Sequence, residues 1–422
     1  MTAAYTSALA EELAPGLLER FERYVRVSTQ SARDRTHSPS TPGQLDLSRM
    51  LVDELLALGL EDADLDANGY VMATLPAGEG AGPAVVGLIA HVDTSPDAPG
   101  DGVEPIVHRG YDGGVVVLPR GGTVLDPEAM PELRDAVGHD LVTSSGDTLL
   151  GADDKAGVAE IMTAVAHLAA HPELPRPTLR IGFTPDEEIG EGASLFDIER
   201  FGARAAYTID GSTLGELSDE TFMAAGAVVR IDGHDVHPGF ATGKLVNATR
   251  LAGQILDRLP AELTPERTSG RDGFIHVFEV QATAARAEIH AILRDFDDEK
   301  LEGHAALLRR VAEEVAGAEP RAKVTVEVRP QYPNMRRFIE PHPEIVDAAI
   351  RAMRAEGLEP VNQPIRGGTD GSILSARGLP TPNLFTGGHE YHSVREWASL
   401  QEMAASAATI VRLAGEWAAV SD

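Results

Sequence analysis

The sequence has 422 residues, of which 43% are hydrophobic, so at ~150 residues per domain it can form two or three domains with a substantial core. Its 66 acidic and 36 basic side chains give a formal net charge of −30, which disfavours nucleic acid and anionic membranes as partners because both require a positive protein surface. Cysteine is absent, which excludes disulfides and thiolate metal sites, so any metal ion must be bound by His, Asp or Glu.

Neither a secretion signal nor a membrane span is expected. Residues 1–12 contain no basic stretch followed by an apolar core. The sequence also has no run of about 18 apolar residues. We therefore expect a cytoplasmic protein.

The first part of the chain combines predicted helices with a buried strand. Apolar residues at helical spacing predict amphipathic helices over residues 17–27 and 45–58. The continuous apolar run at residues 84–90 predicts a strand that is buried on both faces and is followed by His91. Residues 96–146, rich in Gly, Pro and Asp, are expected to form an excursion from this core.

The segment 151–157, Gly-Ala-Asp-Asp-Lys-Ala-Gly, places two adjacent carboxylates where a loop enters the next predicted helix. Because helix starts expose unpaired N–H groups, this acid pair by itself is equally compatible with a helix cap. Strands predicted at residues 178–184 and 205–209 follow, and each is succeeded by acidic residues. Such an alternation is typical of an α/β domain with a mixed, mostly parallel sheet.

Between residues 219 and 330 the predicted order changes to β-α-β-β-α-β, which is that of a ferredoxin-like unit. Beyond it, helices and a short strand resume the first pattern. We therefore expect residues 1–218 and 331–422 to form one discontinuous catalytic domain, and residues 219–330 to form an inserted α+β lid domain.

Acids and histidines gather around the ends of the predicted strands, where binding sites form in open α/β sheets. The candidates are His91, Asp93, Asp153, Glu187, Glu188, Asp210 and His392. A structural histidine or a solvated acidic turn explains each one singly, but not their joint occurrence. Imidazoles and carboxylates without thiolates suit a borderline or hard divalent cation, with zinc the leading candidate.

These candidates are more numerous than one tetrahedral ion requires, and they fit two ions about 3.5–4 Å apart that share a bridging carboxylate. The pair Glu187-Glu188 then suggests a division of labour. One carboxylate would bind metal, and its neighbour would take a proton from a water molecule activated by the metal.

Several segments resemble motifs of the M20 metallopeptidases, a family of dipeptidases, acyl-amino-acid deacylases and tripeptide aminopeptidases. They are His91-Val-Asp-Thr, Gly151-Ala-Asp-Asp-Lys, Asp186-Glu-Glu, Asp210-Gly and the late His392. Five longer segments are similar to the tripeptide aminopeptidase branch, namely residues 148–157, 184–190, 236–248, 365–372 and 383–388. The resemblance covers about residues 15–417, and together the motifs are highly specific. It implies a zinc-peptidase fold for the catalytic domain.

The resemblance implies a ligand set for two zinc ions, with cobalt or manganese as substitutes. His91 and Asp210 would bind one ion, and Glu188 and His392 the other. Asp153 would bridge the two. The resemblance thus implies that metal-activated water releases the N-terminal residue of a tripeptide.

The resemblance also assigns the residues around the ligands. Glu187 corresponds to the general base, and Asp93 to the residue that orients His91. His389 competes with His392 as the late ligand, although His392 matches the family position better. The segment 393–395, Ser-Val-Arg, departs from the Gly-Lys-His of the branch, which puts local substrate contacts in doubt.

Four further residues are implied in substrate binding. Arg294 and Arg366 match positions that hold the C-terminal carboxylate of the peptide, for which a bidentate guanidinium is suited. His237 matches a lid histidine that polarises the scissile carbonyl, and Asn247 is expected to help in the same region. Each also has an ordinary structural interpretation, as a surface arginine or as a turn residue.

Two other functions stay open. One is a different M20 hydrolase, a dipeptidase or N-acyl-amino-acid deacylase, and the other is a non-catalytic metal-dependent binding protein. The presence of Glu187 argues against the latter, because a binding protein needs no spare base beside its ligands. The expected partners are a small peptide substrate and a second copy of the chain, paired through the lid domain.

Overall fold

The computed structural model describes residues 5–420, and their chain forms two compact units. Unit 1 comprises the chain up to Asp219, Met335–Gln363 and the chain from Thr369, and unit 2 comprises Glu220–Asn334 and Pro364–Gly368. Residues 364–368 were expected in the first domain but lie in unit 2, as do residues 331–334 at the boundary. The reason is backbone pairing, since the N–H of Phe222 donates to the carbonyl of Ile365 at 2.9 Å.

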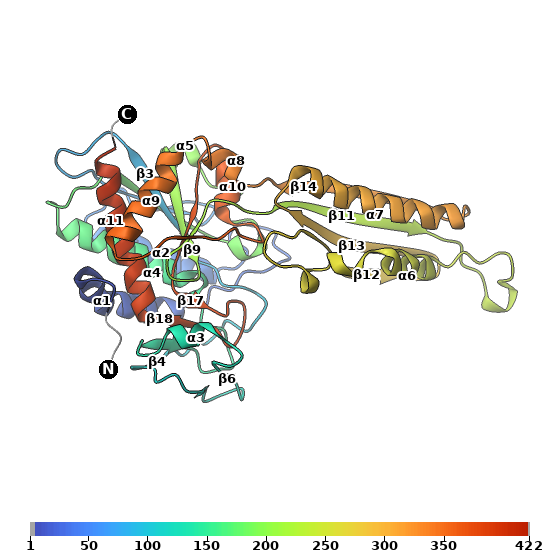
Figure 1. Cartoon of the computed structure of the whole chain (residues 1–422), viewed down its shortest axis with the longest axis horizontal. Helices are drawn as coiled ribbons and strands as arrows, with labels where there is room; N and C mark the ends of the chain where they lie inside the picture. Colours follow the sequence, from blue (N-terminus) through green and yellow to red (C-terminus); the bar gives the residue numbers. More distant parts are fainter. Residues whose placement is uncertain (1–4, 421–422) are drawn as a thin grey trace. The chain divides into compact units, whose positions relative to one another are not determined.

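Unit 1 is built on an eight-stranded mixed sheet that is parallel at its centre (Figure 1), which confirms the predicted fold class. The parallel strands are β8 (Thr178–Thr184), β3 (Val85–His91), β9 (Ala205–Gly211) and β16 (Asn383–Phe385), in that order. Antiparallel pairing joins β2 (Val71–Leu75) to β8, β1 (Asp64–Leu65) to β2, and β10 (Glu216–Ser218) to β16, while β15 (Val361–Asn362) runs parallel to β10.

Helices cover both faces of this sheet. The larger core lies under α1 (Ala8–Val25), α2 (Gly43–Ala57), α4 (Ala152–Ala170), α9 (Pro343–Ala355) and α11 (Leu400–Ala418). A smaller core on the other face involves α5 (Ile198–Phe201) and α10 (Asp370–Ala376). Unit 1 also contains the short helix α8 (Arg336–Ile339), which contacts α9 and α10. Helix α4 is buried along nearly its whole length, as expected for a helix that is apolar on all sides.

The excursion at residues 96–146 contributes to a second, four-stranded sheet in unit 1. Its order is β17 (Gly388–His389), β18 (Trp397–Ser399), β7 (Leu141–Thr143) and β4 (Ile106–His108). The hairpin of β5 (Val116–Val117) and β6 (Val124–Leu125) and the short helix α3 (Glu132–Asp135) accompany it. Pairing of β18 with β7 brings the late segment around residue 396 next to the segment that leads into α4.

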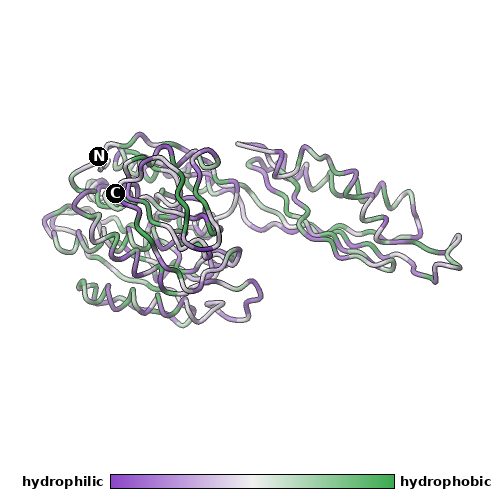
Figure 2. Tube along the Cα trace, turned by 90° about the horizontal axis from the view of Figure 1, so that it is seen from below, coloured by the Kyte–Doolittle hydropathy of each residue, from purple (hydrophilic) through white to green (hydrophobic). Residues whose placement is uncertain are grey.

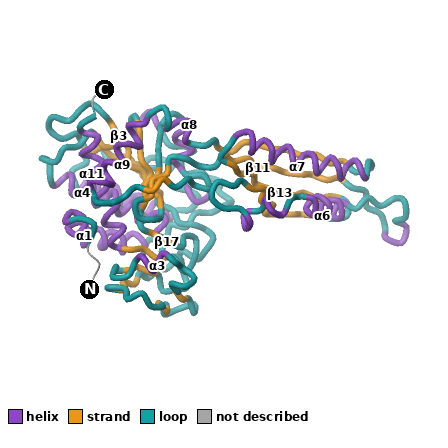
Figure 3. Tube along the Cα trace, viewed as in Figure 1, coloured by secondary structure: helices purple, strands orange, loops and turns teal. Residues whose placement is uncertain are grey.

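Unit 2 has the β-α-β-β-α-β order, with all strands antiparallel. Its elements are β11 (Met223–Asp232), α6 (Ala248–Arg258), β12 (Phe274–Ala282), β13 (Arg286–Asp295), α7 (Asp298–Ala318) and β14 (Lys323–Tyr332). The strand order is β12-β13-β11-β14. The strands alternate in hydropathy (Figure 2) and the two helices run along the sheet (Figure 3), so the core lies between helices and sheet.

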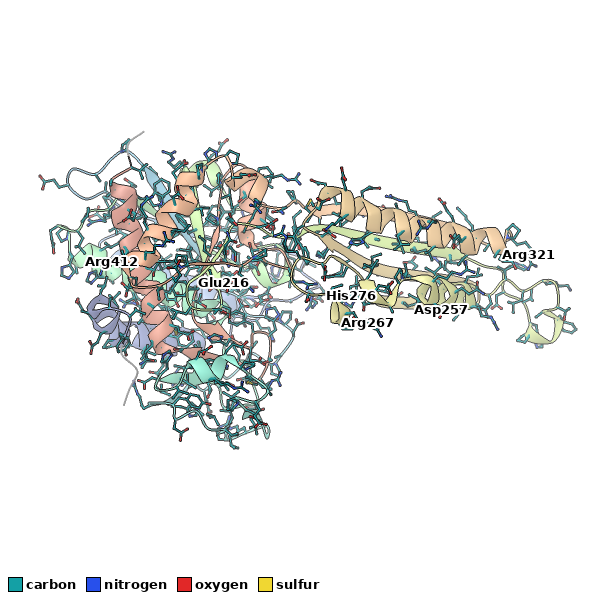
Figure 4. The ribbon with its side chains drawn as sticks, viewed as in Figure 1. Glu216, Asp257, Arg267, His276, Arg321 and Arg412 are labelled. Carbon is teal, nitrogen blue, oxygen red and sulfur yellow. The ribbon has the colours of Figure 1, made fainter. Side chains whose placement is uncertain are left out.

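The pairing of β11 with β13 shows how far apart the two ends of unit 2 lie. Ala224 pairs with Arg294, and eight residues later Asp232 pairs with Arg286, which corresponds to ~27 Å along the strand. The loop after β11 stays at the second end, because Arg321 donates to the carbonyl of Gly243 at 3.0 Å. Figure 4 labels Arg321 at this end of the unit.

No helix among residues 5–420 is both long and apolar enough to cross a membrane.

Candidate metal centre

The candidate ligands gather at the carboxyl ends of the parallel strands of unit 1. His91 is the last residue of β3 and pairs in register with Thr184, the last residue of β8. Glu187 and Glu188 follow β8 in a short 3-10 helix, η1 (Glu187–Ile189), and Asp210 lies at the end of β9. Neighbouring parallel strands therefore deliver all four side chains to one edge of the sheet.

The first cluster of ligand atoms is centred on His91, which is buried. Its Nε2 lies 2.9 Å from Oδ1 of Asp153 and 3.7 Å from Oδ1 of Asp210. These are three nitrogen and oxygen donors of the kinds that bind zinc, with no thiolate among them.

The second cluster is centred on His392, whose Nε2 lies 2.8 Å from Oε2 of Glu188 and 3.3 Å from Oδ2 of Asp153. Asp153 therefore directs one carboxylate oxygen to His91 and the other to His392. A carboxylate with its two oxygens in two donor clusters has the arrangement of a bridging ligand.

The electrostatics of these clusters fit bound cations. Burial, followed by the charge of Asp153, raises the pKa of Glu188 to about 8, and burial raises the pKa of Asp210 to about 6. Oε1 of Glu188 is buried and has no hydrogen-bond partner among residues 5–420. Buried carboxylates and an unpaired oxygen are costly alone, and divalent ions would compensate both.

Asp93 connects the histidine to the pair of glutamates. Its Oδ1 lies 3.3 Å from Nδ1 of His91. The same carboxylate accepts hydrogen bonds from the backbone N–H of Glu187 at 3.0 Å and of Glu188 at 3.2 Å. One buried aspartate therefore holds the ring of His91 and the backbone of η1 in a fixed relation.

The Glu187 side chain is partly buried beside these acids. Burial raises its pKa well above the ordinary range, and the charges of Asp210 and Asp370 add to the effect. A carboxylate whose proton affinity is raised in this way can accept a proton near neutral pH, which is what a general base requires.

Sequence reasoning missed Asp154, the second acid of the Asp-Asp pair. Its Oδ2 accepts from the backbone N–H of His91 at 3.1 Å, and its Oδ1 accepts from Gly157 at 3.2 Å. A side chain at Gly157 would meet the carbonyl of Ile209 at 1.9 Å, so this glycine allows α4 to approach β9. Asp154 thus anchors the His91 backbone to the start of α4.

Glu396, also missed, is a buried carboxylate that holds the loop before α4. Its Oε2 accepts from the N–H groups of Leu150 at 2.7 Å and Gly151 at 2.8 Å, and its Oε1 accepts from Asp153 at 3.0 Å. The sequence shows only an acidic residue directly before the segment Trp397–Ser399, which forms β18. The hydrogen-bond partners of Glu396 could not be predicted, because they depend on the long-range pairing of β18 with β7.

His389 does not belong to either cluster. Its Nε2 lies 2.9 Å from Oε2 of Glu402, and its ring stacks on Trp397 with centroids 4.1 Å apart. Of the two late histidines, His392 is therefore the one beside Glu188 and Asp153.

Both candidate arginines lie in unit 2. Arg294 donates to Gln331 at 3.1 Å and stands over the ring of Tyr332. Arg366 donates to Thr268 at 2.8 Å and stands over the ring of Phe274, whose backbone pairs with Arg294. The two guanidinium groups therefore belong to the same end of one unit.

The other two candidates lie in or beside the loop that follows β11. His237 is exposed and caps the 3-10 helix η2 (Pro238–Phe240), with Nδ1 accepting from Gly239 at 3.1 Å. Asn247 is the N-cap of α6 and accepts from Arg250 at 3.2 Å. These contacts give both residues a local structural role, and the loop lies at the end of unit 2 opposite Arg294.

Comparison with known proteins identifies the family. The model of peptidase family M20/M25/M40 matches residues 147–416. Peptidase T of Geobacillus kaustophilus is 48% identical over 398 residues, covering 94% of this chain and 97% of that protein. Peptidase T of Bacillus subtilis is 47% identical over 404 residues, covering 96% and 98%.

The solved structures agree in fold. Aminopeptidase PepT from Bacillus cereus superimposes with a TM-score of 0.74 at 24% identity, covering 96% of this chain and 99% of that one. A tripeptidase from Staphylococcus aureus gives a TM-score of 0.75 at 22% identity, covering 96% and 98%. The resemblance inferred from the motifs is confirmed: the chain belongs to peptidase family M20/M25/M40 and, within it, to the peptidase T group.

Proposed function

We propose that this protein is a metal-dependent aminopeptidase that releases the N-terminal residue of tripeptides. The observation that carries the proposal is Asp153, whose two carboxylate oxygens each lie beside a different histidine. Near-full-length identity of 47–48% to peptidase T proteins supports this activity over that of the dipeptidases and deacylases in the family.

The donor set suits two divalent ions, which we take to be zinc. His91 and Asp210 would hold one, Glu188 and His392 the other, and Asp153 would serve both. When bound, such ions polarise the scissile carbonyl and make water more acidic. Nitrogen and oxygen donors without sulfur are compatible with zinc, and also with cobalt or manganese.

Glu187 is the residue that we assign to proton transfer. As general base it takes a proton from the attacking water and returns it to the departing amine. Asp93 fixes the backbone of Glu187 and the ring of His91 together, so it keeps the base at a constant position relative to the ligands. Asp93 is therefore a positioning residue, and Glu187 is the catalytic one.

Arg294 and Arg366 are assigned to the C-terminal carboxylate of the substrate. Each extra residue of an extended peptide displaces that carboxylate by ~3.3–3.6 Å, which exceeds the tolerance of a hydrogen bond. Two guanidinium groups at one end of unit 2 would thus select peptides of one length. The expected domain boundaries had placed Arg366 in the catalytic domain and Arg294 in the lid domain, but both arginines lie in unit 2.

His237 and Arg294 cannot contact the same tripeptide within one chain. A tripeptide spans about 10 Å, whereas the strand between the two ends of unit 2 covers ~27 Å. If both residues contact the substrate, they must therefore come from two different chains. We therefore propose a homodimer in which each site takes His237 from unit 2 of the other chain.

The test is a panel of free and N-blocked di-, tri- and tetrapeptides, assayed before and after chelation. We expect rapid cleavage of free tripeptides only, loss of the activity with chelator, and recovery with Zn²⁺. Preferred cleavage of dipeptides or of N-blocked substrates would contradict the proposal, and so would activity that is insensitive to chelation.

A further inference from the structure

A second group of metal-binding side chains lies elsewhere on unit 1, at the C-terminal end of α4. His167 is in the last turn of this helix and His171 caps it four residues later, so both imidazoles share one face. Their ring centroids are 4.5 Å apart. From α1, which packs against α4 (Figure 1), Glu12 places Oε1 3.6 Å from Nδ1 of His167.

The three residues are close to a ligand geometry. One donor atom from each of Glu12, His167 and His171 lies within 4.8 Å of the other two. Tetrahedral zinc with bonds of ~2.0–2.2 Å requires about 3.4 Å between donors, so no pair would have to close by more than about 1.4 Å. The side chains of Glu12 and His171 are 63% and 43% exposed and can move, while His167 is 11% exposed and fixed.

The local charge favours a cation. The carbonyl end of a helix carries partial negative charge, and Glu173 adds a carboxylate 3.0 Å from Nδ1 of His171. Metal-bound histidines commonly have such a carboxylate partner, which fixes the orientation of the ring. Within residues 5–420, neither Glu12 nor Glu173 forms an ion pair with a lysine or arginine, although the charge of Glu173 also acts on Arg176.

We propose that Glu12, His167 and His171 bind one divalent transition-metal ion, such as Zn²⁺. Fourteen residues of helix separate His167 from Asp153, or ~21 Å, so this site is distinct from the centre at the other end of α4. The bound ion would tie α1 to α4 and stabilise the helix that carries Asp153, without taking part in hydrolysis.

Equilibrium dialysis of the full-length protein against buffered Zn²⁺ tests the proposal. We expect His171→Gln to bind one equivalent less than the wild type, with unchanged turnover of tripeptides. His342→Gln is the matched control, because His342 is a 50% exposed imidazole 3.7 Å from Glu344 but belongs to no group of three potential ligands among residues 5–420. This control should bind as much Zn²⁺ as the wild type.

Equal binding by wild type and His171→Gln would overturn the proposal, and so would an equal loss in His342→Gln, which would indicate unspecific surface binding. If His171→Gln folds poorly, Glu12→Gln replaces it, since this side chain is largely exposed. In thermal unfolding, added Zn²⁺ should raise the Tm of the wild type more than that of His171→Gln or Glu12→Gln, because an ion that binds only the native state stabilises it. Equal Tm increments would contradict the site.

Discussion

The two ends of unit 2 provide a quantitative test of the proposed dimer. His237→Ala and Glu187→Gln chains should each be nearly inactive alone. If His237 acts on the other chain's site, a mixed dimer has one complete site, formed by Glu187 of the first variant and His237 of the second. Random pairing makes half of the dimers mixed, so an equimolar mixture should regain about one quarter of the wild-type rate per chain.

The assay is tripeptide hydrolysis after the two variants have been mixed and exchanged, with native mass spectrometry to count mixed dimers. His234→Ala is the control, because this exposed histidine lies three residues before His237 in the same loop. It should be fully active alone. The reasoning is refuted if mixed dimers form and the activity does not return, or if His237→Ala alone retains the wild-type rate.

Three further outcomes are expected. Glu187→Gln should retain metal but lose nearly all turnover, whereas Glu188→Ala should lose metal; elemental analysis beside the kinetics would expose a reversed assignment. Glu396→Gln should lower stability by about 3 kcal/mol, since a buried carboxyl group that accepts from three N–H groups is replaced by an amide whose NH2 cannot accept; denaturant unfolding that shows no change would contradict this. Tripeptides with an amidated C-terminus should be poor substrates for the wild type, and Arg366→Ala and Arg294→Ala should each greatly reduce kcat/KM for free tripeptides; equal wild-type rates on both substrates would rule out carboxylate recognition.

Runs of apolar residues in the sequence were sufficient to predict the buried strands of the main sheet. The strand predicted at residues 178–184 has the observed bounds of β8. The strands predicted at residues 84–90 and 205–209 differ from the observed bounds of β3 and β9 by only one or two residues. This agreement is expected, because a continuous apolar run between polar turns defines a buried strand. Candidates after parallel strand ends also came together in space, since adjacent parallel strands end at one edge.

The positions of Glu396 and Arg366 could not be predicted from the sequence, because they depend on backbone pairing between segments far apart in the chain. Glu396 reaches the loop before α4 only because β18 pairs with β7, which lies about 250 residues earlier. Arg366 belongs to unit 2 because Ile365 pairs with the backbone of Phe222. At the start of the chain, α1 begins at Ala8 rather than near residue 17, because Ser7 caps the helix and Pro15 is tolerated within it.

The place of β16 has a consequence for the biosynthesis of the enzyme. This strand, Asn383–Phe385, lies between β9 and β10 in the interior of the main sheet, although it is near the end of the chain. A nascent chain that has not yet released these residues from the ribosome cannot complete the sheet. It also lacks His392 and Glu396, so the second metal cluster and the support of Asp153 are missing. Peptidase activity should therefore arise only after the segment up to Glu396 has left the ribosome, which keeps shorter nascent chains inert.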